Sequence, residues 1–156
     1  MKDIYMLATL YDQQYRYYRD DLAFYTDIAH DYGSPILELG AGTGRVSIAL
    51  AKAGYQVTGI EYSQDMLALA QERIQGFDHM ISLQKRDMRS LELEQTFPTI
   101  IAPFNTLMHA YTLSDQDATL ATVKRHLAPG GVFAFDLYNP NFSELNVLKR
   151  EAEWEH

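Results

Sequence analysis

The sequence predicts an α/β protein with a doubly wound parallel sheet of about five strands and helices on both faces. Short apolar runs suited to buried strands alternate along the chain with longer amphipathic segments suited to helices. This alternation is typical of βαβ units, in which a helix connects two parallel strands. The 156 residues, 47% of them hydrophobic and 22% charged, fit one domain (1–156) with its own core.

The apolar runs and the periodic segments place each element. The predicted strands are residues 35–39, 55–60, 80–85, 99–103 and 131–137. The predicted helices between them are residues 44–53, 64–75, 105–111 and 115–127. Ser63 and Ser114 stand where N-caps belong, so we expect their hydroxyls to cap the second and fourth of these helices.

One more helix is predicted before the first strand, over residues 11–32. Its tyrosines recur at spacings of three and four residues, which indicates one helical face. That face either packs against the core or places its first tyrosines over a ligand as a lid, offering both rings and hydroxyls. We therefore divide the chain into a lid helix (11–32), a core (33–138) and a C-terminal extension (139–156).

Composition excludes several kinds of function. The net charge of −8 and the scattered Lys and Arg argue against nucleic acid as a partner. The absence of cysteine excludes disulfides and thiolate metal sites, and the histidines lack metal-ligand spacing, so no metal is expected. No apolar run approaches the ~18 residues that span a bilayer and no signal segment precedes the helix, so we expect a cytoplasmic protein without membrane contact.

A glycine-rich turn follows the first predicted strand. Residues 38–44 are Glu-Leu-Gly-Ala-Gly-Thr-Gly, and ligands of open parallel sheets bind beyond the carboxyl ends of the strands. Glycines let the backbone approach a ligand closely, and the following helix presents its N-terminus there. The next strand ends in Glu61, where a carboxylate accepts hydrogen bonds from ribose hydroxyls. The pattern predicts a nucleotide cofactor.

Two classes of cofactor share this arrangement. A dinucleotide fingerprint has its third glycine at the position that Arg45 occupies. Glu38, two residues before the first glycine, suits the ammonium of a methionine group and would repel a pyrophosphate. The residues therefore favour S-adenosylmethionine, with an NAD-binding protein as the alternative.

Four segments together resemble a known family. Residues 36–61, Arg86-Asp87-Met88, residues 102–109 and the turn at 127–131 are similar to the motifs of class I S-adenosylmethionine-dependent methyltransferases. The Tyr11-Asp12 pair and residues 104–109 look like those of small-molecule N-methyltransferases such as glycine N-methyltransferase-like enzymes. The resemblance implies a methyltransferase that acts on a small-molecule acceptor; a non-catalytic cofactor-binding module remains the second hypothesis.

The resemblance also implies which residues bind the cofactor. They are Tyr11, Glu38, Gly40, Ala41, Gly42, Gly44, Glu61, Tyr62, Met66, Asp87, Met88, Ala102 and Phe104. Glu38 and the glycine turn would hold the methionine end, Glu61 the ribose, and Tyr62, Met66 and Asp87 the adenine. Alternatives stay open for two of them, since Met66 is also a plausible core residue and Asp87 a solvated loop acid.

Catalytic roles are predicted for three residues near the reactive methyl group. His109 is the candidate general base, and Asn105 and Tyr11 are polar groups beside it. A structural histidine and a helix-capping Asn105 are the simpler interpretations.

The family's sheet normally ends in an antiparallel hairpin after the fifth strand. Here the chain after that strand has room for one helix, at residues 143–150, so the predicted domain is C-terminally incomplete. The fifth strand would then be an unpaired apolar edge. We therefore expect a dimer or another homo-oligomer formed through this edge.

Overall fold

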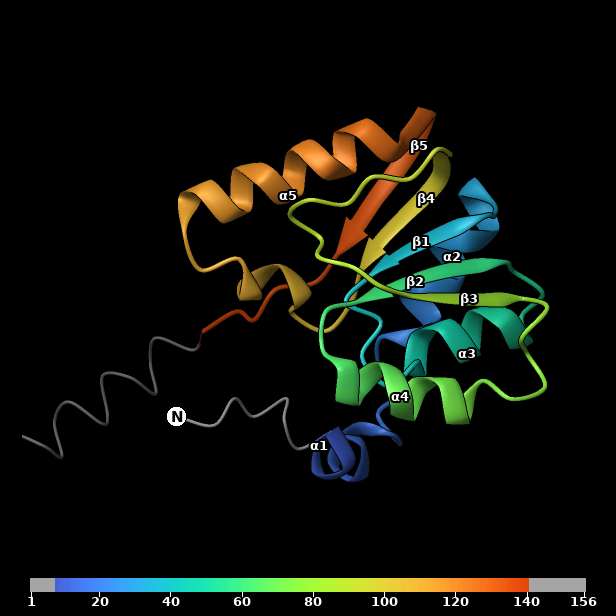
Figure 1. Cartoon of the computed structure of the whole chain (residues 1–156). Coiled ribbons are helices and arrows are strands. Elements are labelled where there is room, and N and C mark those ends of the chain that lie inside the picture. The colour runs from blue at the N-terminus through green and yellow to red at the C-terminus, as the bar shows by residue number, and fades with distance from the viewer. Residues whose placement is uncertain (1–7, 141–156) are drawn as a thin grey trace, which may run out of the picture.

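The computed structural model describes residues 8–140 of the chain (Figure 1). Within that range the elements follow the predicted alternation. In chain order they are α1 (Ala8–Tyr15), α2 (Leu22–Tyr32), β1 (Ile36–Leu39), α3 (Arg45–Lys52), β2 (Val57–Glu61), α4 (Gln64–Arg73), β3 (Ile81–Lys85), β4 (Phe97–Ala102), the 3₁₀ helix η2 (Thr106–His109), α5 (Leu113–His126) and β5 (Leu127–Phe135).

The five strands form one sheet in the order β3-β2-β1-β4-β5. All four neighbouring pairs are parallel, which confirms the predicted fold class. The strand order reverses direction at β1, because β2 lies on one side of it and β4 on the other. Such a switch point opens a crevice at the carboxyl ends of the strands, where ligands of these sheets bind.

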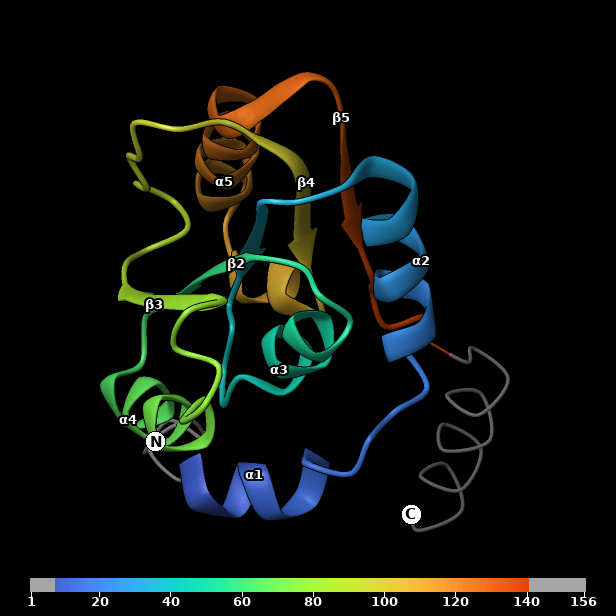
Figure 2. The same ribbon diagram turned by 90° about the vertical axis from the view of Figure 1, so that its right-hand side faces the viewer.

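Both faces of the sheet are covered, as Figure 2 shows with α2 and α5 on opposite sides of the strands. Successive side chains of β1 alternate between the faces. Ile36 packs with Tyr25 of α2 and Leu50 of α3. Leu37 packs on the other face, with Val123 of α5. Because both faces are covered, every residue of β1 is buried, and the strand is apolar apart from Glu38.

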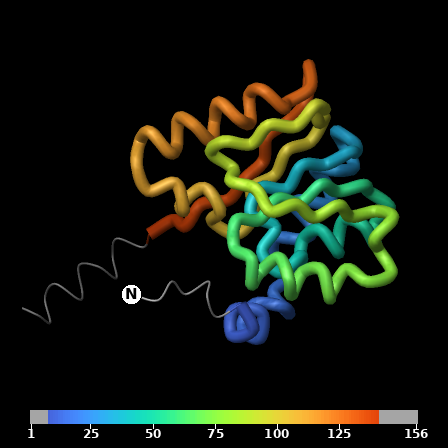
Figure 3. The backbone as a smooth tube through the Cα atoms, viewed as in Figure 1, coloured from blue at the N-terminus to red at the C-terminus, as the bar shows by residue number. Residues whose placement is uncertain are grey.

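The connection between β3 and β4 runs over the same face as α5 (Figure 3). Leu91 of this connection is 1% exposed and belongs to the core cluster of that face. The backbone N–H of Leu93 donates to Nε2 of His126 at 2.9 Å, while Nδ1 of His126 lies 2.8 Å from the carbonyl of Thr122. His126 is therefore a structural histidine that fixes the connection to α5.

The predicted helix over residues 11–32 was wrong, because a turn separates α1 from α2. Arg45 of α3 makes a two-pronged ion pair with Asp21 in this turn, with both distances at 2.6 Å. Arg19 donates to the carbonyls of Arg16 and Tyr18, at 2.7 and 2.9 Å. The Arg19 bonds satisfy two backbone carbonyls of the turn, and the Arg45–Asp21 pair fixes the turn against α3. The break lets α2 pack on the sheet while α1 lies beside α4.

Ser63 caps α4 as predicted, accepting from the Met66 N–H at 3.4 Å. The predicted cap Ser114 was wrong: Thr112 is the N-cap of α5 and accepts from the Asp115 N–H at 3.1 Å. Its extended backbone, with φ −110° and ψ 156°, is the conformation that a cap requires.

Most element boundaries differ from the predictions by one or two residues, and the larger differences lie in the second half of the chain. The predicted helix at 105–111 is the shorter η2, and α5 gives way at once to β5, which begins at Leu127 and ends at Phe135. The β4–β5 ladder tolerates this early start through a register shift between Phe97 and Thr99. The predicted helix at 143–150 lies outside the described residues. In the described part of the chain, no helix has the length and apolar character needed to cross a membrane.

Candidate active site

A cavity of about 800 Å³ lies at the carboxyl ends of the strands. Its volume suits a small-molecule or cofactor site, for which ~300–1,000 Å³ is typical. Ten of the predicted site residues line it, and they come from α1 and from the segments after β1, β2, β3 and β4. They are Tyr11, Gly40, Gly42, Glu61, Tyr62, Asp87, Met88, Phe104, Asn105 and His109.

Glu61 joins the glycine turn to the end of β2. One carboxylate oxygen accepts from the Gly42 N–H at 2.9 Å, and the other accepts from the Ser63 N–H at 2.8 Å. Charge-assisted bonds to backbone donors fix the orientation of a carboxylate. Glu61 is therefore a rigid acceptor group in the cavity wall, with lone pairs left for a ligand.

Gly40 is the point where the glycine turn meets η2. A Cβ atom at this position would lie 2.7 Å from the Thr106 side chain, and the backbone has φ +66°. Both the space and the dihedral angle therefore require glycine. At Gly44 the reason is the backbone alone, with φ +80°, because a Cβ there would make only an ordinary contact of 3.6 Å with Ala70 and Ile74.

Glu38 lies beneath the glycine turn, where its side chain accepts a hydrogen bond from the Ser47 hydroxyl of α3. It is 2% exposed, and burial raises the pKa of its carboxyl to about 8. Together with Ala41 and Tyr11, Glu38 lines a second, smaller cavity that adjoins the first. A cation bound in that cavity would favour the ionised carboxylate.

Three predicted residues do not line either cavity, and Gly44 is one of them. Met66 at the start of α4 is 2% exposed, and Ala102 at the end of β4 is fully buried; neither is among the residues that line the described cavities. The burial of Met66 agrees with its alternative interpretation as a core residue. Their roles in cofactor binding stay predictions.

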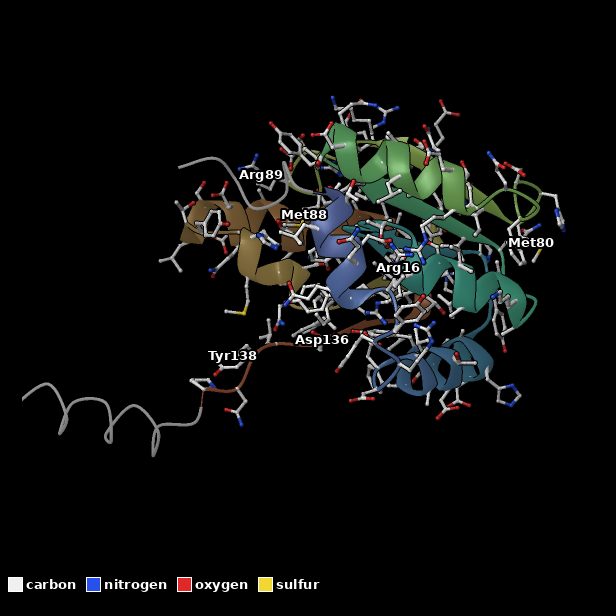
Figure 4. All side chains as sticks on the ribbon, turned by 90° about the horizontal axis from the view of Figure 1, so that it is seen from below. Arg16, Met80, Met88, Arg89, Asp136 and Tyr138 are labelled. Carbon is white, nitrogen blue, oxygen red and sulfur yellow. The ribbon has the colours of Figure 1, made fainter. Side chains whose placement is uncertain are left out.

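Asp87 follows β3 and is held by Arg89. Its carboxylate accepts from the Arg89 backbone N–H at 2.9 Å and from the Arg89 guanidinium at 2.6 to 3.1 Å. These bonds lower the pKa of Asp87. Arg89 also reaches Asp115 of α5 at 3.0 Å, so the loop beside Met88 is tied to α5. Figure 4 shows Met88 and Arg89 together at this side of the site.

The segment after β4 turns through two consecutive left-handed residues, Phe104 (φ 56°) and Asn105 (φ 62°). Asp136, directly after β5, accepts from both of their backbone N–H groups, at 2.7 and 2.6 Å. The Tyr25 hydroxyl of α2 donates to the same carboxylate at 2.8 Å, and burial together with this bond raises the pKa of Tyr25. Asp136 thus holds a strained turn in place.

His109, in η2, lies at the rim of the cavity. Its Nδ1 is 3.3 Å from the Tyr111 hydroxyl, and the two rings meet edge to face with centroids 6.2 Å apart. Asn105 contributes its side chain nearby, and among the described residues its buried Oδ1 has no hydrogen-bond partner. The structure therefore brings all three predicted catalytic residues, including Tyr11, to one cavity.

Helix α1 lies across the site in Figure 4, which is seen from below, with Arg16 to one side of it, Met88 to the other and Asp136 beyond its end. Its tyrosines contact the strained turn. The rings of Tyr15 and Phe104 have centroids 4.9 Å apart, and those of Tyr11 and Phe104 are 6.4 Å apart. The Arg45 guanidinium lies 5.5 Å from the centre of the Phe104 ring. The lid and the turn are one aromatic cluster.

Sequence reasoning missed two acids that organise the site. Asp136 stands immediately after the fifth strand, as Glu61 ends the second, so its position at a strand end was an available signal. Asp12 is 3% exposed and accepts from the Thr43 hydroxyl at 3.0 Å; the resemblance drew attention to the Tyr11-Asp12 pair, but no role of its own was predicted for Asp12. In the part of the chain that the structure describes, no cluster of three acids or histidines could hold a metal ion.

A parallel sheet in this order, with a glycine turn after β1 and acids after β2 and β3, defines a cofactor-binding domain of the methyltransferase type. The sequence profile of the methyltransferase domain matches residues 36–131, and the chain belongs to that family. The resemblance inferred from residues 36–61 is thereby confirmed.

Relatives of known name share the same region. The cypemycin N-terminal methyltransferase of a Streptomyces species is 32% identical over 108 residues, 69% of this chain and 43% of that protein. The dTDP-3-amino-3,4,6-trideoxy-alpha-D-glucopyranose N,N-dimethyltransferase of Streptomyces venezuelae is 30% identical over 99 residues, 64% of this chain and 40% of that protein. The chain thus spans less than half the length of these two relatives.

Among solved structures, the glycopeptide N-methyltransferase MtfA in complex with sinefungin superposes with a TM-score of 0.70 at 27% identity. The match covers 82% of this chain and 58% of MtfA. MtfA has also been solved with S-adenosyl-L-methionine and with S-adenosyl-L-homocysteine.

Proposed function

We propose that this chain is the cofactor-binding part of an S-adenosylmethionine-dependent methyltransferase that methylates an amine of a small-molecule acceptor. The observation that carries the proposal is the wall of the main cavity, where Glu61 is fixed between the N–H groups of Gly42 and Ser63. The relatives support it, because the three named above are N-methyltransferases by name and MtfA binds this cofactor.

The residues present fit the cofactor. Glu61 offers carboxylate lone pairs to ribose hydroxyls, and Tyr62, Asp87 and Met88 line the side of the cavity beyond it, where adenine would lie. The smaller cavity, lined by Glu38, Ala41 and Tyr11 among others, suits the methionine end. When bound, the sulfonium supplies an electrophilic methyl group.

The acceptor side of the cavity is aromatic and, among the described residues, carries no Asp, Glu, Lys or Arg side chain. The segments after β4 and β5 contribute to the lining Phe104, Asn105, Thr106, Met108, His109, Tyr111 and Tyr138. Such a wall binds an amine through its aromatic faces and excludes water from the reacting groups. Most of the rate enhancement would come from this positioning.

An amine must lose a proton in the course of methylation, and His109 is placed to accept it at a ring nitrogen. The contact between Nδ1 and Tyr111 at 3.3 Å orients the ring. Tyr11 and Asn105 are then polar groups that position the acceptor. The alternative, a module that binds the cofactor without catalysis, differs in having no methyl transfer.

Calorimetric titration with S-adenosylhomocysteine tests the cofactor site. We expect saturable binding to the wild type and no binding of NAD. Glu61→Gln should weaken the affinity by about 50-fold or more, since it removes charge-assisted bonds worth ~1.5–3 kcal/mol each. Glu92→Gln is the matched control, because Glu92 is an exposed acid paired with Arg125 at 3.4 Å outside the site; it should bind like the wild type.

Methyl transfer to acceptors tests the activity itself. Labelled S-adenosylmethionine and a panel of amino sugars and peptides with a free N-terminus should give a methylated product that depends on His109. Binding of the cofactor without transfer to any amine would favour the non-catalytic module. Absence of binding to the wild-type chain would overturn the whole proposal.

A homo-oligomer and a cytoplasmic location belong to the same proposal. Within the described residues β5 is an edge strand, and Phe135 at its end is 42% exposed. An apolar edge favours pairing with a second strand. Light scattering after size exclusion should show a species larger than a monomer; a monomer at all concentrations would contradict the oligomer.

A further inference from the structure

Helix α1 is fixed over the site by a buried polar cluster that the function proposed above does not use. Asp12 of α1 is 3% exposed and Thr43 of the glycine turn is 4% exposed. The Thr43 hydroxyl donates to the Asp12 carboxylate at 3.0 Å. Residues 31 positions apart are thereby joined where α1 meets the glycine turn.

Arg73, in the last turn of α4, completes the cluster. Its guanidinium donates to the Asp12 carboxylate, to the Thr43 hydroxyl at 2.9 Å and to the Thr43 carbonyl at 3.2 Å. Arg16 adds an ion pair to Asp12 at 3.1 Å from the more exposed side. A buried carboxylate is stable when its charge is paired and its lone pairs are satisfied in this way.

Helix α1 depends on such contacts. It has eight residues, and helices shorter than ~12 residues are marginal in water without tertiary contacts. Asp12 is adjacent to Tyr11, which lines both cavities. The position of Asp12 therefore sets where the Tyr11 ring lies relative to Gly42, the neighbour of Thr43.

We propose that Asp12, Thr43 and Arg73 form a latch that holds α1 closed over the cofactor, so that Asp12 and Arg73 are positioning residues for cofactor binding. The inference rests on the proposed function, since it assumes that the cavities bind an adenosyl amino acid. Because the latch includes the glycine turn itself, the lid and the turn move as one unit. Loss of the latch frees α1 and shortens the residence of the ligand beneath it.

The test uses the full chain and S-adenosylhomocysteine as the probe. Asp12→Asn keeps the size of the side chain and removes the charge, and it should raise the dissociation constant about tenfold. Arg73→Gln removes the partner of Asp12 on α4 and should raise the dissociation constant by a similar factor. Hydrogen exchange of the amides of residues 8–15 should become faster in both variants, while the amides of the sheet keep their protection.

Thr99→Val is the matched control for a lost buried hydrogen bond. The Thr99 hydroxyl donates to the Gly33 carbonyl at 2.8 Å, at the end of the sheet away from the cavity. We expect this variant to lose thermal stability and to bind the probe within twofold of the wild type. If Asp12→Asn does not fold, Arg73→Gln decides the question, because Arg73 is 26% exposed and tolerates replacement better.

Three outcomes separate the possibilities. A wild-type chain that does not bind the probe overturns the proposed function. Wild-type binding with unchanged affinity in folded Asp12→Asn or Arg73→Gln overturns the latch alone. Equal losses of affinity in Thr99→Val and the latch variants also overturn it, because they would reflect a general loss of stability.

Discussion

The two halves of the site are built on different principles. Over β1, β2 and β3, the backbone turns on glycines and the acid Glu61 binds backbone N–H groups of its own neighbourhood. Over β4 and β5, the turn consists of Phe104 and Asn105, two residues with side chains in the left-handed region. That turn is held from a distance by Asp136, 32 residues after Phe104.

The difference shows which residues determine the conformation of each turn. A glycine turn is specified by residues within one short segment, because glycine adopts positive φ without steric cost. A left-handed residue with a side chain costs ~1–2 kcal/mol, so it persists only where other contacts enforce it. The part over β1, β2 and β3, which we propose binds the cofactor (the cofactor half), is therefore encoded locally. The part over β4 and β5, which we propose binds the acceptor (the acceptor half), depends on the folded sheet.

Gly40→Ala should have the largest effect on stability, because Gly40 lies where the two halves meet. The new Cβ would lie 2.7 Å from the Thr106 side chain, and overpacking costs ~1–3 kcal/mol beyond the ~1–2 kcal/mol of a left-handed alanine. We expect the free energy of unfolding to fall by about 2–5 kcal/mol in urea denaturation. The double variant Gly40→Ala/Thr106→Ala should regain the part of the free energy of unfolding that was lost to overpacking. If the losses of the two single variants simply add in the double variant, the two side chains do not contact each other here.

Asp136→Asn should come next and should act on the acceptor half alone. It replaces charge-assisted bonds to the Phe104 and Asn105 N–H groups, and we expect a loss of about 2–3 kcal/mol in the free energy of unfolding. The affinity for S-adenosylhomocysteine should change by less than threefold. Tyr25→Phe, which removes one of the three bonds to Asp136, should cost about 1 kcal/mol. A loss of affinity as large as that of Glu61→Gln would disprove the independence of the halves.

Glu38→Gln should have the smallest effect, a change in how the free energy of unfolding depends on pH. It tests the protonation state of Glu38 in the cofactor half. Burial raises the pKa of Glu38 from 4.5 to about 8 in the folded chain, so between these values the folded state binds more protons than the unfolded state. The stability of the wild type relative to Glu38→Gln therefore falls as pH rises through this window, by about 1.4 kcal/mol per pH unit at most. Denaturation curves at pH 6 and 7 would show it. If the stability difference between the wild type and Glu38→Gln is the same at both pH values, Glu38 is already ionised in the folded chain.

The sequence was sufficient for the features that are local. The glycine turn, Glu61 at a strand end and the Ser63 cap each depend on a few neighbouring residues. It failed at 16–21, where the helix break depends on Arg45 pairing with Asp21 across 24 positions. The sequence also led to the wrong N-cap, Ser114 in place of Thr112. Both hydroxyls lie near the start of α5, and only the backbone conformation distinguishes them.

The strand beneath the site, β1, tolerates few substitutions. All four residues of β1, Ile36–Leu39, are buried, and a strand enclosed on both faces accepts side chains of nearly unchanged volume. The segments beyond β4 and β5 are different, since Met108, Tyr111 and Tyr138 line the cavity with 49%, 79% and 62% of their surface exposed. Substitutions at this rim are therefore tolerated more easily than substitutions in β1, and under the proposed function they would change the acceptor while β1 stays fixed.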